Sequence, residues 1–448
     1  MNKSRLNRRT FAKLSLGTAL FGLAALQTET SHARILGAND RIQLGFCGIA
    51  NRGGQLLTAF DGNNDQCDVA AICDIDTETL EKVKQRYNNQ PFATTEYEKL
   101  LERADLDGIV LATPDHWHAL QTIWACKAGK DVYCEKPLSI TIVEGRKMVE
   151  AARKYNRVVQ VGVHRRSAPH YRDLASKNLD QMIGFITAGR SARLSNMFPN
   201  GIGRCQASDA PAKLNWDKWL GPRQERPFQE NIAPYKFRWW SLYSSQMANW
   251  GVHYMDAMRW LLKETAPSSV CAMGGRFAVD DDRTIPDTAE VMFQFKSGRL
   301  LSFMTYEANG NPVMATNEKY RQLGEFELRG TNGTLYVTDN GWQVKPERGG
   351  QFSPSKYYME PMEGPGTKLA DTERLHAKNF LDCMKTREKP NADVEEGHRS
   401  TTMSHLANIS LQMQQRLEWD ADKERFINND AANELLQYEY RAPYKLEV

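Results

Sequence analysis

Short apolar runs alternate with amphipathic stretches along the first third of the chain, from Arg41 to about Val163. The runs have the length of strands, are separated by helical patterns, and lie at 42–47, 69–73, 108–113, 131–134 and 157–163. This spacing is typical of βαβ units, whose strands lie parallel in one sheet. We therefore expect a doubly wound α/β domain over residues 40–163.

The pattern changes after about His164, where longer segments alternate strictly between apolar and polar residues. These segments are joined in pairs by short turns and lie at 288–295, 299–306, 325–329 and 334–337. Such hairpins predict an antiparallel sheet. Helical patterns follow at 372–384 and 400–415. We expect residues 164–448 to form an α+β domain with a large, open, mainly antiparallel sheet.

The composition narrows the class of protein. A chain of 448 residues exceeds one ordinary core, and 41% hydrophobic with 25% charged residues is typical of a globular protein. The net charge of +3 and the absence of a basic stripe argue against nucleic-acid binding. The eight cysteines form no CxxC pair and match no zinc spacing, so we predict neither a metal site nor a disulfide framework.

The first 33 residues are typical of an export signal. The pair Arg8-Arg9 precedes a moderately apolar stretch from Leu14 to Leu26, and Ser31-His32-Ala33 supplies a small-x-small cleavage site. The alternative is a membrane anchor, but this apolar stretch is too short to span a bilayer. We predict a twin-arginine signal at 1–33, export of the folded protein to the periplasm, and no stable membrane anchor.

A glycine-rich turn follows the strand predicted at 42–47. Its sequence, Gly-Ile-Ala-Asn-Arg-Gly-Gly, aligns with the G-x-G-x-x-G motif of dinucleotide-binding domains, with alanine in place of the middle glycine. The context supports the motif, because the turn follows a strand and opens a helix. We place the cofactor against Gly48, Ala50, Asn51, Arg52 and Gly53.

Asp74 ends the next predicted strand. A carboxylate at this place in a dinucleotide-binding fold accepts hydrogen bonds from the ribose hydroxyls and repels a 2′-phosphate. Asp74 therefore favours NAD over NADP, although Asp76 could share this role and Arg52 leaves NADP open.

Two further segments lie at predicted strand ends, where doubly wound sheets bind ligands. Thr113 ends the strand at 108–113 and Pro114 follows it. His118 follows them as either a helix-start residue or a catalytic group. Glu135 and Lys136 end the strand at 131–134. A lysine among apolar neighbours has a lowered pKa and can exchange protons near neutral pH. The alternative for Lys136 is a surface lysine that precedes a helix. We include all five residues in the cofactor site.

His253 and Asp256 are spaced i, i+3 on one face of a probable helix in the second domain. Histidine is the usual side chain for accepting a hydroxyl proton at neutral pH. Asp256 could orient His253, pair with Arg259 or cap nearby backbone.

At these residues the chain resembles the Gfo/Idh/MocA family of sugar and polyol oxidoreductases, and the Glu135-Lys136-Pro137 motif is the most specific part of the match. The resemblance implies a Rossmann domain that binds NAD(P), a second domain whose open sheet serves oligomerisation, and hydride transfer between a sugar hydroxyl carbon and the nicotinamide. By position, Lys136 and His253 match the family's catalytic lysine and histidine. Asn249 departs from the family, because many of its polyol dehydrogenases carry aspartate there.

The expected function is that of an exported, homo-oligomeric, NAD-dependent oxidoreductase of a sugar, polyol or glycoside. Candidates for contact with the carbohydrate are His164, Arg165, Trp240 and Asp256. One alternative is a glycoside hydrolase or lyase that oxidises its sugar transiently with bound NAD, although such relatives commonly lack the Glu-Lys-Pro lysine. A further alternative is a non-catalytic sugar- or nucleotide-binding protein.

Overall fold

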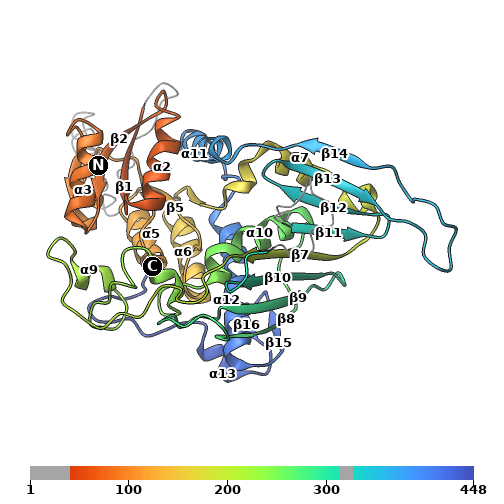
Figure 1. Cartoon of the computed structure of the whole chain (residues 1–448). Coiled ribbons are helices and arrows are strands. Elements are labelled where there is room, and N and C mark those ends of the chain that lie inside the picture. The colour runs from red at the N-terminus through yellow and green to blue at the C-terminus, as the bar shows by residue number, and fades with distance from the viewer. Residues whose placement is uncertain (1–40, 312–325) are drawn as a thin grey trace, which may run out of the picture.

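The computed structural model describes residues 41–311 and 326–448, which form two sheets with their covering helices (Figure 1). The first sheet lies at the left of Figure 1 and the second extends to the right, while the C-terminus returns to the side of the first. The predicted export signal at 1–33 lies outside the described residues. Among the helices of the described ranges, none combines the length and the apolar character needed to cross a bilayer.

The first sheet is parallel throughout, as the alternation of the sequence predicts. Its strands in spatial order are β3 (Phe92–Thr94), β2 (Cys67–Cys73), β1 (Ile42–Cys47), β4 (Gly108–Leu111), β5 (Asp131–Cys134) and β6 (Val159–Val161). This is the Rossmann order, in which the direction of winding reverses between β1 and β4. The reversal leaves a crevice at the carboxyl ends of these two strands, where a ligand can lie.

Helices cover both faces of this sheet, which explains why its central strands are continuous apolar runs. They are α2 (Asn51–Asp61), α3 (Thr77–Arg86), α4 (Tyr97–Leu101), α5 (His118–Lys127) and α6 (Ile142–Lys154). Helix α6 begins with a reciprocal cap: the Thr141 hydroxyl accepts from the backbone N–H of Glu144, and the Glu144 carboxylate accepts from that of Thr141. Local sequence thus determines where the helix after Lys136 begins.

Within residues 41–311 and 326–448, the second sheet has ten strands. Their spatial order is β14 (Met362–Pro365), β13 (Gly341–Pro346), β12 (Gly333–Thr338), β11 (Phe326–Gly330), β7 (Ile186–Leu194), β10 (Leu300–Tyr306), β9 (Thr288–Gln294), β8 (Ser269–Gly275), β15 (Leu417–Asp420) and β16 (Arg425–Phe426). All neighbours are antiparallel except β7 and β10. The predicted fold class, a Rossmann domain followed by an α+β domain with a large, mainly antiparallel sheet, is confirmed.

The remaining helices are α7 (Pro169–Ser176), α8 (Leu179–Ile183), α9 (Trp216–Leu220), α10 (Val252–Leu261), α11 (Leu369–Thr386), α12 (Val394–Met413) and α13 (Asp430–Glu434). Helix α12 contacts both α6 and β8, so it lies between the two sheets. Helix α11 follows β14 in the chain but packs on α2, where Phe380 and Met384 join the apolar core of the Rossmann domain. A helix from the second unit therefore completes the apolar core of the Rossmann domain.

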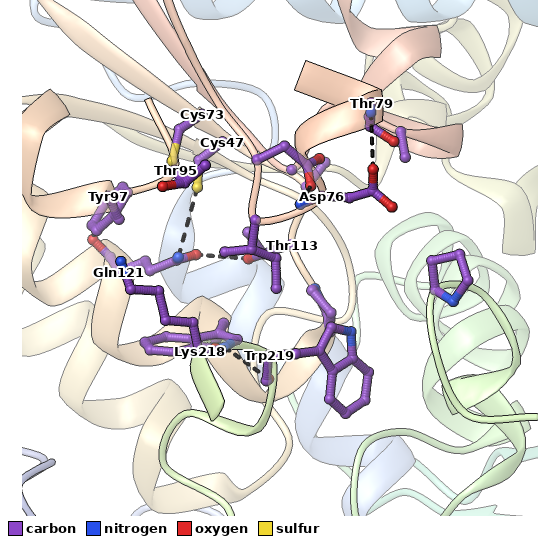
Figure 2. A pocket seen from close by; sticks show the side chains of 18 of the residues that line it. Cys47, Cys73, Asp76, Thr79, Thr95, Tyr97, Thr113, Gln121, Lys218 and Trp219 are labelled. Atoms are coloured by element: carbon purple, nitrogen blue, oxygen red, sulfur yellow. Dashed lines mark hydrogen bonds between the residues drawn. The ribbon is translucent and has the colours of Figure 1, made fainter. Parts of the chain in front are cut away.

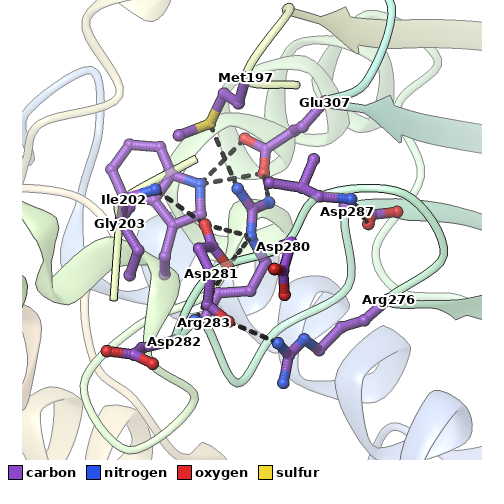
Figure 3. A network of polar contacts seen from close by, with 12 residues as sticks. Met197, Ile202, Gly203, Arg276, Asp280, Asp281, Asp282, Arg283, Asp287 and Glu307 are labelled. Carbon is purple, nitrogen blue, oxygen red and sulfur yellow. Dashed lines mark hydrogen bonds and ion pairs between the residues drawn. The ribbon is translucent and has the colours of Figure 1, made fainter. Parts of the chain in front are cut away.

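A buried ionic network anchors the long irregular segment 197–245 to the second sheet (Figure 3). The guanidinium of Arg283 is fully buried; its Nε donates to Asp281 at 2.9 Å and its Nη1 pairs with Glu307, just beyond β10. The indole Nε1 of Trp239 donates to Glu307 at 2.9 Å. These bonds hold the segment that contains α9 and Arg238 beside the Rossmann domain.

Candidate active site

The glycine-rich turn brings the start of α2 against β1 and β4. Gly48 has φ +76°, and a Cβ there would lie 2.7 Å from the backbone of Ala112. A Cβ on Gly53 would lie 1.9 Å from the carbonyl oxygen of Gly48, so α2 can approach the strand only without side chains at both positions. Ala50, at the helix N-cap, supplies no side-chain acceptor for the first N–H groups of α2. An anion such as a pyrophosphate is the natural partner of this helix end.

Asp74 lies across from this turn and is bonded to it. One carboxylate oxygen accepts the backbone N–H of Ile49 at 2.9 Å, and the other accepts that of Asp76 at 3.0 Å. Burial raises the pKa of Asp74, and the backbone N–H donors oppose that effect. Asp74 thus holds the turn in shape, and each oxygen keeps a further lone pair for a ribose hydroxyl. Asp76 instead caps α3, where it accepts the N–H of Thr79 at 2.9 Å.

A pocket of about 1200 Å³, including its open mouth, lies between these strand ends and the second domain. Figure 2 shows Lys218 and Trp219 of α9 facing the strand ends that carry Cys47, Cys73 and Thr113. Seven of the predicted cofactor residues line it, namely Gly48, Ala50, Asn51, Arg52, Asp74, Thr113 and Pro114. The uncapped helix end, the carboxylate and the pocket fit an NAD molecule.

Arg52 reaches from the start of α2 to the end of β5. Its Nε pairs with Glu135 at 2.8 Å, and its Nη1 pairs with Glu373 of α11. Burial by itself would raise the pKa of Glu135, but the positive charges of Arg52 and Lys136 outweigh it, so the pKa lies below its ordinary value. Because Arg52 pairs with both carboxylates, its positive charge is already neutralised. Arg52 is therefore less suited to bind the 2′-phosphate of NADP.

Lys136 extends from the end of β5 to the second domain. Its Nζ donates to the backbone oxygen and to the side-chain oxygen of Asn249, both at 2.9 Å. Burial lowers the pKa of Lys136 to about 8, and the charge of Arg238 acts in the same direction. The neutral amide of Asn249 lies where an aspartate would supply an opposing charge. Lys136 is therefore a group that can exchange a proton near neutral pH.

His253 and His164 lie ring to ring beside this lysine. His253 is the second residue of α10 and follows a π-helical turn at Met247–Gly251, whereas His164 begins the 3-10 turn after β6. Their ring centroids are 5.1 Å apart, and each residue is 6% exposed. Burial, reinforced by the charges of Arg165 and Lys136, lowers the pKa of both histidines well below the ordinary value. Arg165 is itself buried and lies over the ring of Tyr254 at 5.4 Å.

Two of the predicted carbohydrate-contacting residues, Asp256 and Trp240, make structural contacts instead and do not line the pocket. Asp256 is fully buried and bound to Arg166 at 2.8 Å and to the Ser400 hydroxyl at 2.6 Å; Arg259 lies 3.9 Å away. Of the roles open to it, pairing with arginines is therefore the one it adopts. Trp240 donates from its indole to the carbonyl oxygen of Asn231 at 2.8 Å and packs in an aromatic cluster.

His118 joins two loops of the Rossmann domain. Its Nδ1 lies 2.7 Å from the carbonyl oxygen of Pro137, and its Nε2 lies 2.9 Å from that of Thr113. Burial lowers its pKa, but Cys134, Asp115 and the Pro137 carbonyl outweigh burial and raise it to about 10. Two carbonyl partners require two N–H donors, which agrees with a protonated ring. His118 contacts backbone, as one of its two predicted roles requires.

Two functional groups escaped the sequence reasoning. Asp115 is buried, accepts the hydroxyl of Ser244 and has its pKa raised by burial; its charge acts on Lys136. Arg238, from the second domain, lines the pocket. Asp115 stands inside the Thr-Pro-Asp-His-Trp-His segment and could have been proposed from its strand-end position. The sequence around Arg238 gave no sign that this segment of the second domain lies beside the cofactor pocket.

Comparisons with known proteins agree with this geometry. An oxidoreductase family model described as a NAD-binding Rossmann fold matches residues 42–163. A GFO/IDH/MocA C-terminal domain model matches 219–336, and an oxidoreductase-family C-terminal alpha/beta domain model matches 360–446.

Individual relatives match parts of the chain. A glycosyl hydrolase family 109 protein of Shewanella pealeana is 28% identical over 34% of this chain and 38% of its own length. Levoglucosan dehydrogenase of Pseudarthrobacter phenanthrenivorans is 25% identical over 54% of this chain and 58% of its own length. The chain thus spans less than two thirds of either curated relative. A solved levoglucosan dehydrogenase in complex with NADH aligns with a TM-score of 0.63 at 18% identity, over 85% of this chain and 99% of that one, which shows a common fold.

Proposed function

Because the chain belongs to the Gfo/Idh/MocA oxidoreductase family, we propose that it is a NAD-dependent oxidoreductase of a sugar, polyol or glycoside. The observation that carries this proposal is the position of Lys136. Its ammonium lies between the Rossmann strand ends and Asn249, within the electrostatic influence of Arg52 and Arg238, which line the pocket. Lys136 itself does not line the pocket, but these two arginines link it to the pocket, and this supports a role for a group that loses its proton at about pH 8 where we expect the substrate to meet the cofactor.

The residues divide the binding of the cofactor between them. The N-terminus of α2 would hold the pyrophosphate, and Asp74 would accept from the adenosine ribose. When bound, the nicotinamide supplies the hydride acceptor for the carbon that carries the substrate hydroxyl. Asp74 disfavours a 2′-phosphate, and Arg52 is engaged by two carboxylates, so the site fits NAD better than NADP.

We assign the proton of the substrate hydroxyl to Lys136 Nζ. Its pKa of about 8 makes the neutral amine accessible near neutral pH, whereas the lowered pKa of His253 makes that imidazole a weaker base. His253 instead holds the hydroxyl as a neutral hydrogen-bonding partner. Asn249 keeps the lysine amine in place through its two oxygens.

A direct test measures both binding and turnover. The purified protein is examined by mass spectrometry for bound nicotinamide, and NADH formation is followed with levoglucosan, myo-inositol and D-glucose. We expect NAD to bind and at least one carbohydrate to reduce it. Failure to bind NAD, or turnover that survives the Lys136→Met substitution, would contradict the assignment.

A second function is favoured by one specific observation, the match to a glycosyl hydrolase family 109 protein. In that case NAD would oxidise the sugar transiently and be restored within each cycle. The Glu135-Lys136 pair speaks for the dehydrogenase, since glycosidases of this type commonly lack the lysine. Release of the aglycone from aryl glycosides without added NAD would favour the hydrolase.

We further propose export and self-association. The leader with Arg8-Arg9 supports twin-arginine export to the periplasm, and Arg8→Lys with Arg9→Lys should retain the protein in the cytoplasm on cell fractionation. Self-association is supported by exposed apolar side chains on neighbouring strands of the second sheet: Met273 is 77% exposed and Met292 50% exposed. Light scattering should show an oligomer that the Met292→Glu variant weakens.

A further inference from the structure

The histidine pair beside Lys136 has hydrogen-bonding capacity that the protein does not use. Within the described residues, both ring nitrogens of His164 and Nδ1 of His253 have no hydrogen-bond partner, although each residue is only 6% exposed. Leaving a buried polar atom unsatisfied costs about 1–3 kcal/mol. A ligand that formed hydrogen bonds with these three neighbouring atoms would recover this cost.

Other buried histidines of the chain show how this cost is ordinarily avoided. His118 directs its two ring nitrogens to carbonyl oxygens, and His376 uses Nδ1 for the Ser167 hydroxyl and Nε2 for the carbonyl of Val161. His164 begins a 3-10 turn three residues beyond β6 and has no such partner for either ring nitrogen. His116 also leaves one ring nitrogen without a partner, whereas His164 is the histidine of the described residues that leaves both.

The charge state of the pair limits what it can bind. Burial and the charges of Arg165 and Lys136 lower the pKa of both rings, so each is neutral at neutral pH. A neutral imidazole has one N–H donor and one lone pair, which matches a hydroxyl group, itself a donor and an acceptor. The arginine and the lysine also disfavour a cationic ligand.

We propose that His164 and His253 bind two adjacent hydroxyl groups of the carbohydrate, with His253 at the hydroxyl that is oxidised and His164 at its neighbour. Adjacent hydroxyl oxygens of a sugar ring lie about 3 Å apart, so two hydrogen bonds of about 2.8 Å can reach ring nitrogens of both histidines. The separation of 5.1 Å between the ring centroids is compatible with this span. The substrate class is thus a vicinal diol.

This inference rests on the proposed function and adds a specificity residue to it. His164 transfers no proton in this scheme. It hydrogen-bonds the neighbouring hydroxyl and so orients the reacting carbon toward the cofactor pocket. A site that hydrogen-bonds a hydroxyl rejects the analogue lacking that group, because the buried nitrogens are then left without a partner.

The experiment compares His164→Phe, which removes both nitrogens, with His164→Gln, which keeps a donor and an acceptor. His405→Phe is the matched control, because His405 is a buried histidine whose Nε2 lies 3.1 Å from the Ser139 carbonyl. The probes are D-glucose, myo-inositol and levoglucosan with their monodeoxy analogues, each with NAD. The readouts are kcat/KM and the ¹⁵N spectrum of histidine-labelled protein loaded with NAD.

For the wild type, removal of the hydroxyl beside the reacting carbon should lower kcat/KM at least about 100-fold. In H164F this penalty should shrink to a few-fold, and in H164Q it should return in part, while H405F should keep it. The ring nitrogens of His164 and His253 should shift when the diol is added and remain unshifted with the deoxy analogue.

Equal deoxy penalties in the wild type and H164F, or ring nitrogens that no carbohydrate of the set shifts, would overturn the inference. Turnover without these shifts would support the oxidoreductase function and contradict the diol site. Shifts without NADH formation would support the diol site and contradict the proposed oxidation. The spectra of the labelled wild type give the second readout if H164F does not fold.

Discussion

Replacing Asn249 with aspartate is expected to raise the pKa of Lys136 and to move the pH dependence of turnover upward. The side-chain oxygen of Asn249 lies 2.9 Å from Lys136 Nζ, and Asn249 is 8% exposed. The substitution changes one amide group into a carboxylate of nearly the same shape. It therefore adds one negative charge at this oxygen and leaves the backbone contact in place.

The size of the effect follows from the distance. An opposite charge within about 4–6 Å shifts a pKa by about 1–3 units, and one unit corresponds to about 1.4 kcal/mol. From its value of about 8, the pKa of Lys136 should thus rise to between about 9 and 11. Since only the neutral amine accepts a proton, turnover at neutral pH should fall by a factor of at least about 10.

The assay is the initial rate of NADH formation with a carbohydrate that the wild type oxidises, measured from about pH 6 to pH 11. Asn249→Ala is the control, because it removes the amide without adding a charge, and its profile should not move upward. An N249D profile whose ascending limb lies at the same pH as that of the wild type would refute the reasoning. Lys136 would then not be the group that titrates during turnover.

The remaining predictions concern single groups of the site and the core. Lys136→Met should abolish turnover while NAD binding, measured by calorimetry, stays within about two-fold of the wild type; loss of both would point to a structural lysine. Asp74→Ala should weaken NAD binding by about 10-fold or more, because a charge-assisted hydrogen bond contributes about 1.5–3 kcal/mol; an unchanged Kd would exclude Asp74 as a ribose partner. Gly53→Ala should destabilise the protein by about 1–3 kcal/mol in urea unfolding, since its Cβ would lie 1.9 Å from a carbonyl oxygen, whereas Gly54→Ala, with its nearest neighbour at 3.7 Å, should not. Arg283→Met should cost about 3–5 kcal/mol in the same measurement, because it leaves two carboxylates buried without their cation; a loss below about 1 kcal/mol would contradict that view of the network.

Local chemistry made several site residues predictable. Gly48 and Gly53 follow a strand and open a helix, and Asp74 ends the next strand, so the motif and its context could be read together. Lys136 lies just after β5, and the carboxyl ends of parallel strands meet at one edge of the sheet. The parallel sheet itself follows from apolar runs at regular spacing, because strands covered on both faces need apolar side chains throughout.

Helical spacing was a weaker guide. The i, i+3 relation places His253 and Asp256 near each other on α10. The partners of Asp256, however, are Arg166 in the 3-10 turn after β6 and Ser400 in α12, which are far away in the chain. A carboxylate pairs with whichever cation the packing brings to it, and an arginine at 2.8 Å outweighs a neutral imidazole. Spacing shows which residues share a face and leaves their partners open.

The sequence alone determined the two kinds of sheet, the glycine turn and the place of Lys136 just after a strand, because these depend on periodicity and on the residues next to each position. Only the tertiary structure decided that Lys136 meets Asn249, 113 positions away, that His164 faces His253, and that Trp219 and Arg238 close the pocket. It also decided that β7 lies parallel to β10. The reason is physical: a hydrophobic pattern reports which positions are buried, whereas contacts between distant segments depend on how whole elements pack, and the pKa of Lys136 depends on the burial and charges that this packing creates.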